Sequence, residues 1–577
     1  MIEKPKLLLN LYWHMHQPDY RDSVTGDFVL PWTYLHAIKD YSDMAFHLEH
    51  NPKAKVSFNF VPILLDQLED YAEQFKTGVI KDPMLRLLSA PDLNIISRQE
   101  RRLIKSSCFK NFHEKMLKPY PAYQRLFDLH QSLFGDGFDN SMYLSGQYLA
   151  DLIVWYNLAW MGESIKKNHY LVQRLIEKSN QFDKDDRINL FKLIGEIITD
   201  IIPRYKKLVN SGQIEISSTP DTHPILPLLL DFNSTFDAMP NASMPQNNQY
   251  SGGKLRARRH IEMAQISHKK RFGKEPVGFW PAEGAVSHVA LSLMAEHGIH
   301  WTATGEAVLA NSLIKSGVPL TNKAEYLYQP YRVGDTDNSI VCFFRDDSLS
   351  DKIGFEYAKV HSGAAVANFI SHLERIYYAS SHDKSAIVSV ILDGENAWEY
   401  YPYNGYYFLT ELYSALAEHP YIQMTTPSEI LKILHAKKIA IQILPEISAG
   451  SWVYGSFSTW IGSPEKNKAW DLLCEAKRAY DTEIKTGKLS AKELVLCERQ
   501  LAICEGSDWF WWFGDYNSSD SVSSFDSLYR HNLSNLYILL NLPVPLSLNR
   551  TISHGTSEAA TQDGISGAMR RGQELIG

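Results

Sequence analysis

The sequence lacks the features that mark several protein classes. Its 577 residues include only five cysteines, an odd number, and no Cys-x-x-Cys pair. This argues against a disulfide framework and a thiolate zinc site, and it predicts free, buried thiols in a reducing compartment. No apolar run approaches the length of a membrane span. The apolar run in the opening MIEKPKLLLNLYW is too short for a secretory signal peptide, and no small-residue cleavage site follows it. We therefore expect a cytoplasmic protein without a membrane partner.

Long blocks of positive charge are also missing. The net charge is −8 and no basic block occurs, which makes nucleic acid a poor candidate partner. The chain is 44% hydrophobic and 21% charged, the balance of a soluble globular protein too long for one ordinary core. Aromatic residues reach 12%. Flat aromatic faces hold sugar rings, but large cores use them as well, so composition leaves both interpretations open.

Short apolar runs alternate with helical patterns along much of the chain. This rhythm predicts right-handed βαβ units and a parallel sheet or barrel. Residues 66–208 instead show helical periodicity throughout, which indicates a helical insertion, and helical periodicity returns after about residue 443. The predicted strands cover residues 6–13, 55–60, 213–218, 277–280, 299–302, 339–345, 387–392 and 423–426.

These patterns predict an α/β protein with three parts. Residues 1–435 form the barrel, including the insertion at about 66–208. Residues 436–545 form a helical domain. Residues 546–577, rich in Ser, Thr and Gly, form a poorly ordered tail.

One predicted strand runs directly into a group of acids. The stretch SVILDGENAWEYY begins as a buried parallel strand and continues into Asp393, Glu395 and Trp398. Side chains just beyond the carboxyl ends of barrel strands are well placed for chemistry. The alternative is that Asp393 only caps a turn that Gly394 allows.

A second acid follows another short strand in VGFWPAEGAVS. Pro281 ends that strand and Glu283 comes next, beside Trp280. Glu283 could simply be an acid near the N-terminus of the following helix, where the helix macrodipole stabilises its negative charge. It could also be a nucleophile, because two carboxyl groups, one ionised and one protonated, carry out glycoside hydrolysis. A barrel could direct Glu283 and Asp393 at the same point.

Histidines end the first predicted strand in the motif HMHQP. His14 and His16 share a face because alternate residues of an extended segment do so. The pair could hydrogen-bond sugar hydroxyls, or it could bind a metal with further ligands such as Glu215, His223 or Asp393. Glu215 lies between two isoleucines in GQIEI. Its charge therefore needs a polar cavity or a partner, unless the face of the strand that carries it is exposed to solvent.

Two further groups are candidates for binding. Arg345 and Asp346 end a strand, where they form either a solvated ion-pair cluster or a clamp on substrate hydroxyls. Trp452 and Trp460 lie in a Gly/Ser-rich segment rather than on an apolar helix face, which favours a sugar platform folded over the barrel. The aromatic run at 508–515, DWFWWFGD, is more typical of a core.

Five of these motifs resemble, in order, the sequence regions of glycoside hydrolase family 57: HMHQP, GQIEI, WPAEG, LDGENAWE and GSWVYGSFSTWIG. The similarity extends from about residue 7 to about residue 540. It implies an incomplete (β/α)7 barrel with helical additions and retaining chemistry on α-glucans, without a metal or other cofactor.

The resemblance also implies roles for single residues. Glu283 matches the family's nucleophile and Asp393 its general acid/base. EGSDWFWWFGDY resembles the amylopullulanase and α-amylase branch, but Tyr516 and Asn517 stand where a further acid and His usually follow Asp515, which bears on bond specificity. The substrate-binding candidates are His14, His16, Glu215, His223, Trp280, Arg345, Asp346, Glu395, Trp398, Trp452, Trp460 and Asp515.

We thus expect an α-amylase-like enzyme that binds α-glucan polysaccharides or oligosaccharides. Transfer (4-α-glucanotransferase), amylopullulanase or branching activity is the alternative. Two other hypotheses remain open: a metal-dependent deacetylase or mannosidase-like enzyme, and a glucan-binding protein without turnover.

Overall fold

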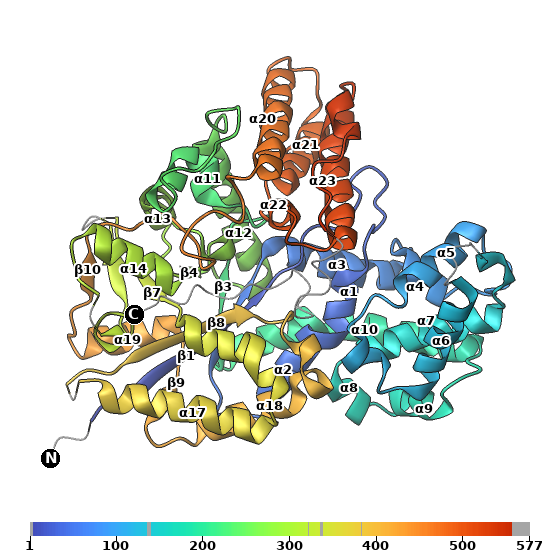
Figure 1. The fold of residues 1–577 in the computed structure, drawn as a ribbon, viewed down its shortest axis with the longest axis horizontal. Helices are drawn as coiled ribbons and strands as arrows, with labels where there is room; N and C mark the ends of the chain where they lie inside the picture. Colours follow the sequence, from blue (N-terminus) through green and yellow to red (C-terminus); the bar gives the residue numbers. More distant parts are fainter. Residues whose placement is uncertain (1–3, 135–139, 321, 335–337, 382, 557–577) are drawn as a thin grey trace.

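A computed structural model describes residues 4–134, 140–320, 322–334, 338–381 and 383–556 (Figure 1). At its centre is a ten-stranded sheet in the order β10-β6-β7-β5-β4-β3-β2-β1-β8, and β9 pairs with β1. The successive parallel strands are β1 (Leu7–Met15), β2 (Val56–Phe60), β3 (Ile214–Ser218), β4 (Gly278–Phe279), β5 (Trp301–Thr304), β7 (Ile340–Phe344) and β8 (Ile387–Asp393). The remaining strands are β6 (Tyr331–Val333), β9 (Ile422–Met424) and β10 (Gln442–Leu444).

The seven parallel strands curl into an incomplete barrel. Strands β7 and β8, at the two ends of this series, meet through the isolated bridge between Arg345 and Ser389 and are not paired as a ladder in the described chain. The predicted incomplete (β/α)7 architecture is therefore confirmed. All nine residues of β1 are buried, as expected for a parallel strand covered on both faces.

Helices surround the sheet and form two additions to it. The first connects β2 to β3 and extends to the right in Figure 1. Several of its helices begin with a side-chain cap; Ser97 and Asp183, for example, start α5 and α10 with capping boxes. The helices of this insertion are α3 (Pro62–Thr77), α4 (Pro83–Leu88), α5 (Arg98–Ser107), α6 (Pro121–Phe134), α7 (Gly146–Trp160), α8 (Glu163–Asn168), α9 (Tyr170–Lys178) and α10 (Lys184–Asn210).

The second addition is a C-terminal bundle, drawn at the top of Figure 1. It contains α20 (Pro464–Ile484), α21 (Ala491–Cys504), α22 (Asp508–Trp512) and α23 (Ser519–Leu539). Residues 546–556, expected within a poorly ordered tail, instead pack on α23. Asp526 accepts hydrogen bonds from the backbone N–H groups of Ile552 and Ser553, at 2.7 and 3.3 Å. The rest of the expected tail, 557–577, lies outside the described residues.

The five cysteines are free and buried, as the sequence predicts. Among the described residues, no helix is both long and apolar enough to cross a membrane.

Candidate active site

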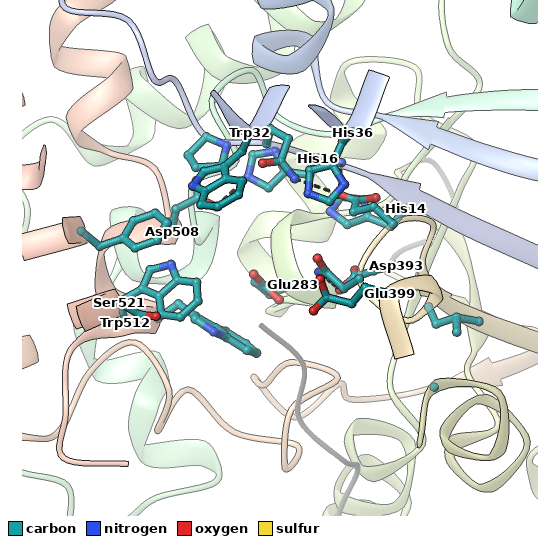
Figure 2. Close-up of a pocket in the computed structure, with 18 of the residues that line it drawn as sticks. His14, His16, Trp32, His36, Glu283, Asp393, Glu399, Asp508, Trp512 and Ser521 are labelled. Atoms are coloured by element: carbon teal, nitrogen blue, oxygen red, sulfur yellow. Dashed lines mark hydrogen bonds and ion pairs between the residues drawn. The ribbon is translucent and has the colours of Figure 1, made fainter. Parts of the chain in front are cut away.

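A cavity of about 510 Å³ opens at the carboxyl ends of the barrel strands (Figure 2). Eight of the residues expected in the site line it: His14, His16, His223, Glu283, Arg345, Asp393, Glu395 and Trp452. They lie at the carboxyl ends of β1, β3, β4, β7 and β8 or in the segments that follow, apart from Trp452, which comes from the segment after β10. The topology therefore brings together side chains that are hundreds of residues apart in the sequence.

Strand order explains why the two candidate catalytic acids share one cavity. Glu283 follows β4 and Asp393 ends β8. Counted through the seam, β8 is three positions from β4 in a ring of seven, and it is four positions away in the other direction. No two strands of such a ring can be farther apart, so the two carboxyl groups face the cavity from opposite walls. Figure 2 shows both side chains pointing into the same space.

A strained backbone presents Glu283 to the cavity. Its φ of 57° lies in the left-handed region, which costs energy for a residue other than glycine. Trp452 holds it at two points: its backbone N–H donates to the Glu283 carbonyl (3.2 Å) and its indole Nε1–H donates to Oε2 (3.0 Å). A left-handed conformation maintained by its surroundings in this way is typical of functional sites.

Asp393 is set up to hold a proton at higher pH than an ordinary aspartate. Burial raises the pKa of Asp393 to about 6, even though the Asn396 amide (2.9 Å from Oδ2) and the charges of His16 and Arg345 act to lower it. In the register of β1 and β8, Asp393 lies beside His14. An aspartate with this pKa can act as a proton donor near neutral pH.

A second carboxyl group, Glu395, lies beside Asp393. One oxygen accepts from the backbone N–H of His16 (3.1 Å) and from the hydroxyl of Tyr41 (3.4 Å), whereas Oε2 is buried and has no partner among the described residues. Burial, and then the charge of Asp393, raise the pKa of Glu395 well above its usual value. This shift favours the protonated form of Glu395, which can donate a hydrogen bond to a ligand.

Three imidazoles form one wall of the cavity. The rings of His16 and His223 stack with centroids 3.9 Å apart, and His14 lies 5.1 Å from His223. Burial lowers the pKa of His14 to about 3 and lowers that of His223 well below its usual value, so both rings are neutral. Each is anchored from outside the cavity: His14 by Asn59 (2.7 Å) and His223 by Ser507 (2.8 Å). Neutral imidazoles can donate to and accept from sugar hydroxyls.

His16, His223 and Asp508 also provide the donor types of a metal site, with ligand atoms within 4.8 Å of one another. The stacked rings are inclined by only 23°. In-plane lone pairs on nearly parallel rings do not converge on one ion at a bonding distance of about 2.1 Å. A ring would have to turn, which would break the bond from His16 to Asp508 (2.7 Å) or from His223 to Ser507. As arranged, these residues do not fit a metal ion.

Glu215, expected in the pocket, lies near the amino end of β3 instead. Its carboxylate accepts from the indole of Trp301 (3.0 Å) and from the backbone N–H (3.0 Å) and hydroxyl (2.5 Å) of Ser428, at the start of α19 (Pro427–Ala436). The expected partner of its charge therefore exists, but it is a helix N-terminus at the opposite end of the barrel.

Three expected binding tryptophans are core residues. Trp280, Trp398 and Trp460 are each at most 1% exposed. Trp280 packs beneath the site, with its ring 5.1 Å from that of Trp452. The indole of Trp398 donates to the carbonyl of Gly394 (2.8 Å) and so supports the turn after Asp393. These residues shape the cavity without lining it.

Two expected acids also lie off the cavity. Asp346 caps the helix after β7, with its Oδ1 accepting from the backbone N–H of Leu349 (2.9 Å) and its Oδ2 accepting from Tyr328 (2.9 Å). Asp515 is exposed, and its carbonyl accepts from Thr556 (2.9 Å). Neither carboxylate is available to a ligand in the cavity.

The cavity includes residues that the sequence did not point to. Asp508 binds His16 Nε2, and Trp512 stacks on Phe525 with ring centroids 4.5 Å apart. The aromatic run that looked like core therefore supplies one wall. The additional lining residues labelled in Figure 2 are Trp32, His36, Glu399, Asp508, Trp512 and Ser521.

Comparison with known proteins gives consistent results. Residues 10–444 match the sequence model of glycosyl hydrolase family 57. No curated protein sequence matches the chain. Solved structures share its fold at 14% sequence identity. One is a family 57 branching enzyme from Thermococcus kodakaraensis, with a TM-score of 0.55 over 93% of this chain and 88% of that one. Another is an α-amylase from Thermotoga maritima, with a TM-score of 0.54 over 93% of each chain. A 4-α-glucanotransferase from Thermococcus litoralis, also 14% identical, has a TM-score of 0.50 over 92% of this chain and 60% of that one.

Proposed function

The chain belongs to glycosyl hydrolase family 57, and from this premise we propose that it is a retaining enzyme that hydrolyses α-1,4-glucans. The observation that carries the proposal is the pair of carboxyl groups, Glu283 and Asp393, on opposite walls of one cavity. In such a pair one group forms a bond to carbon and the other moves a proton. The resemblances to a branching enzyme, an α-amylase and a 4-α-glucanotransferase support an α-glucan as the substrate.

In the first step, Glu283 attacks the anomeric carbon as the glycosidic bond breaks. Asp393 gives its proton to the leaving oxygen, so the products of this step are a free sugar hydroxyl and a glycosyl ester on Glu283. In the second step, the Asp393 carboxylate removes a proton from water, whose oxygen displaces Glu283 from the sugar. A sugar hydroxyl in place of water would give transfer.

The polar lining of the cavity suits an uncharged substrate rich in hydroxyl groups. Six carboxyl groups line it among the described residues, together with the three imidazoles, and such groups can hydrogen-bond sugar hydroxyls. The six acids are Glu283, Asp393, Glu395, Glu399, Asp508 and Asp520.

Product analysis on maltoheptaose tests the proposal. We expect shorter maltooligosaccharides that are released with the α-configuration. Longer oligosaccharides would indicate 4-α-glucanotransfer, and new α-1,6 linkages would indicate branching. Glucan binding without any product would identify a binding protein and would overturn the proposal.

The pH dependence should follow Asp393. Because its pKa is raised to about 6, catalysis that needs protonated Asp393 is present below that pH and is lost as the pH rises through it. Replacing Asn396 by Ala removes a hydrogen bond that favours the ionised form. We therefore expect the alkaline limb of kcat/KM to move to higher pH in Asn396→Ala.

The control for this experiment is Asn247→Ala, which removes a similar bond to Asp471 (2.6 Å) away from the cavity. Its alkaline limb should coincide with that of the unaltered protein. A limb that stays in place or moves to lower pH in Asn396→Ala would show that Asp393 is not the acid.

Chelation should leave turnover unchanged. The stacking of His16 on His223 does not allow both rings to bind one ion. We expect the same rate of maltoheptaose cleavage before and after dialysis against a chelator, with no metal in stoichiometric amount by elemental analysis. Loss of activity that zinc restores would favour the metal-dependent hypothesis instead.

A further inference from the structure

The side chain of Arg345 lies at the seam of the barrel, where its donors are already bound to the protein. Its Nε–H donates to the carbonyl of Ile391 on β8 (2.7 Å), and its two terminal nitrogens bind Asp347 (2.6 Å) and Asp351 (2.8 Å). The residue is 5% exposed. At least three of the five N–H donors of a guanidinium are thus directed away from a ligand, which is not the arrangement of the expected clamp on substrate hydroxyls.

This guanidinium lies over the indole ring of Trp452. The central carbon of the guanidinium lies 5.4 Å from the centroid of the indole, within the range of a cation–π contact. Trp280 meets the same indole edge-on, with an interplanar angle of 72°. The Trp452 ring is therefore held between a fixed cation and a fixed ring.

The backbone of Trp452 is confined as well. A Cβ atom added to Gly305 would lie 2.6 Å from the Trp452 Cα, and one added to Gly284 would lie 3.4 Å from its Cβ. This close approach sets the main chain of Trp452 against the segment that carries Glu283. With the backbone fixed, Trp452 can move only by rotating its indole, and the contacts with Arg345 and Trp280 restrict that rotation.

We infer that Arg345 is a positioning residue: it fixes the indole of Trp452, whose N–H orients the carboxylate of Glu283. The connection is continuous, since Trp452 Nε1 lies 3.0 Å from Glu283 Oε2. The inference rests on the proposed role of Glu283 as nucleophile. Its consequence is that Asp347 and Asp351, which hold the guanidinium, also affect the rate without contacting the substrate.

A double-mutant cycle tests this inference. The variants are Arg345→Met, Trp452→Phe and the two combined, assayed on maltoheptaose at about pH 5, where Asp393 is protonated in each. Arg345→Met should lower kcat by roughly 10–100-fold with little change in KM, because the nucleophile is misplaced while the binding surfaces remain. If Arg345 acts through Trp452, the double variant should be no slower than Trp452→Phe alone.

The matched control is Arg271→Met. Arg271 is also 5% exposed and also binds two carboxylates, Asp66 and Glu69, but it lies outside the cavity. This substitution should lower thermal stability and leave kcat unchanged. Arg345→Lys keeps the charge but loses the three fixed hydrogen bonds of the guanidinium. It should have an intermediate kcat, so the inference stays testable if Arg345→Met does not fold.

Losses that multiply in the double variant, or an Arg345→Met enzyme with unchanged kcat, would overturn the inference. The proposed function fails on a different result, namely turnover by Glu283→Gln. A multiplicative cycle together with an inactive Glu283→Gln enzyme would reject only the role of Arg345.

Discussion

Replacing Glu283 by Gln is expected to abolish turnover, with kcat lower by roughly 10⁴-fold or more. An amide does not form the glycosyl ester, so the first step has no nucleophile. The fold should persist, because Gln keeps the shape of the side chain and its oxygen can still accept from Trp452 Nε1. Release of reducing ends from maltoheptaose measures the loss, and a thermal melt verifies the fold.

Glu215→Gln is the matched control. It makes the same chemical change in another acid of a predicted motif, but one that lies at the opposite end of the barrel and binds Trp301 and Ser428. This variant should lose stability and keep its kcat. Near-normal turnover by Glu283→Gln, or equal loss of kcat in both variants, would contradict the assignment.

The second large effect concerns Glu505, at the end of α21. It is 1% exposed and binds Arg256 (2.8 Å), His260 (2.7 Å) and Tyr250 (2.5 Å). Glu505→Gln should lower the free energy of unfolding by about 3–5 kcal/mol, because removing one charge of a buried pair leaves the other uncompensated. Urea unfolding followed by tryptophan fluorescence measures the change.

The stability that Glu505 contributes should fall as the pH is lowered. Burial alone would raise the pKa of Glu505, but the charge of Arg256 and the hydrogen bond from His260 lower it far below its usual value. The stabilisation is therefore fully present above the unfolded-state pKa of about 4.3 and is lost as the pH falls below it. The difference between the two proteins should be constant from pH 6 to 8 and shrink in acid.

Glu498→Gln is the control for Glu505. Glu498 lies 3.6 Å from the same Arg256, but its side chain is 33% exposed, so its loss should cost only about 0–1 kcal/mol. Equal effects of the two substitutions, or a Glu505 effect that grows in acid, would show that the buried pair does not stabilise the fold as described.

The barrel, and the position of Glu283 and Asp393 at one cavity, could be predicted because both depend on local patterns. Continuous apolar runs mark strands buried on both faces, and the residue that follows such a run lies at the carboxyl end where parallel strands meet. Asp393 and Glu283 satisfied this pattern, as did His14 and His16 at the end of β1. The short strands β6 and β10 were not recognised from the sequence.

The same pattern could not show which end of a strand a residue occupies. Glu215 is the second residue of β3, so its apolar neighbours indicated burial correctly while its side chain serves the opposite end of the barrel. Burial likewise explains Trp398 and Trp460: aromatic residues near a site are often its support, and sequence does not distinguish support from lining.

Contacts between distant segments were also out of reach. Asp508 binds His16, 492 positions away, only because the C-terminal bundle docks over the barrel. The donors of Arg345 are occupied because β7 and β8 approach at the seam. The left-handed backbone of Glu283 depends on the Trp452 segment and is not encoded in the motif around it alone.

The most direct test of the account is to identify the residue that carries the sugar during turnover. A fluorinated maltosyl fluoride, which forms a glycosyl-enzyme faster than it is released, should increase the protein mass by one glycosyl group. Mapping by proteolysis and mass spectrometry should place that group on Glu283, and Asp393→Asn should accumulate the same adduct. An adduct on Asp393 or another residue, or no adduct during cleavage with inversion of configuration, would contradict the account.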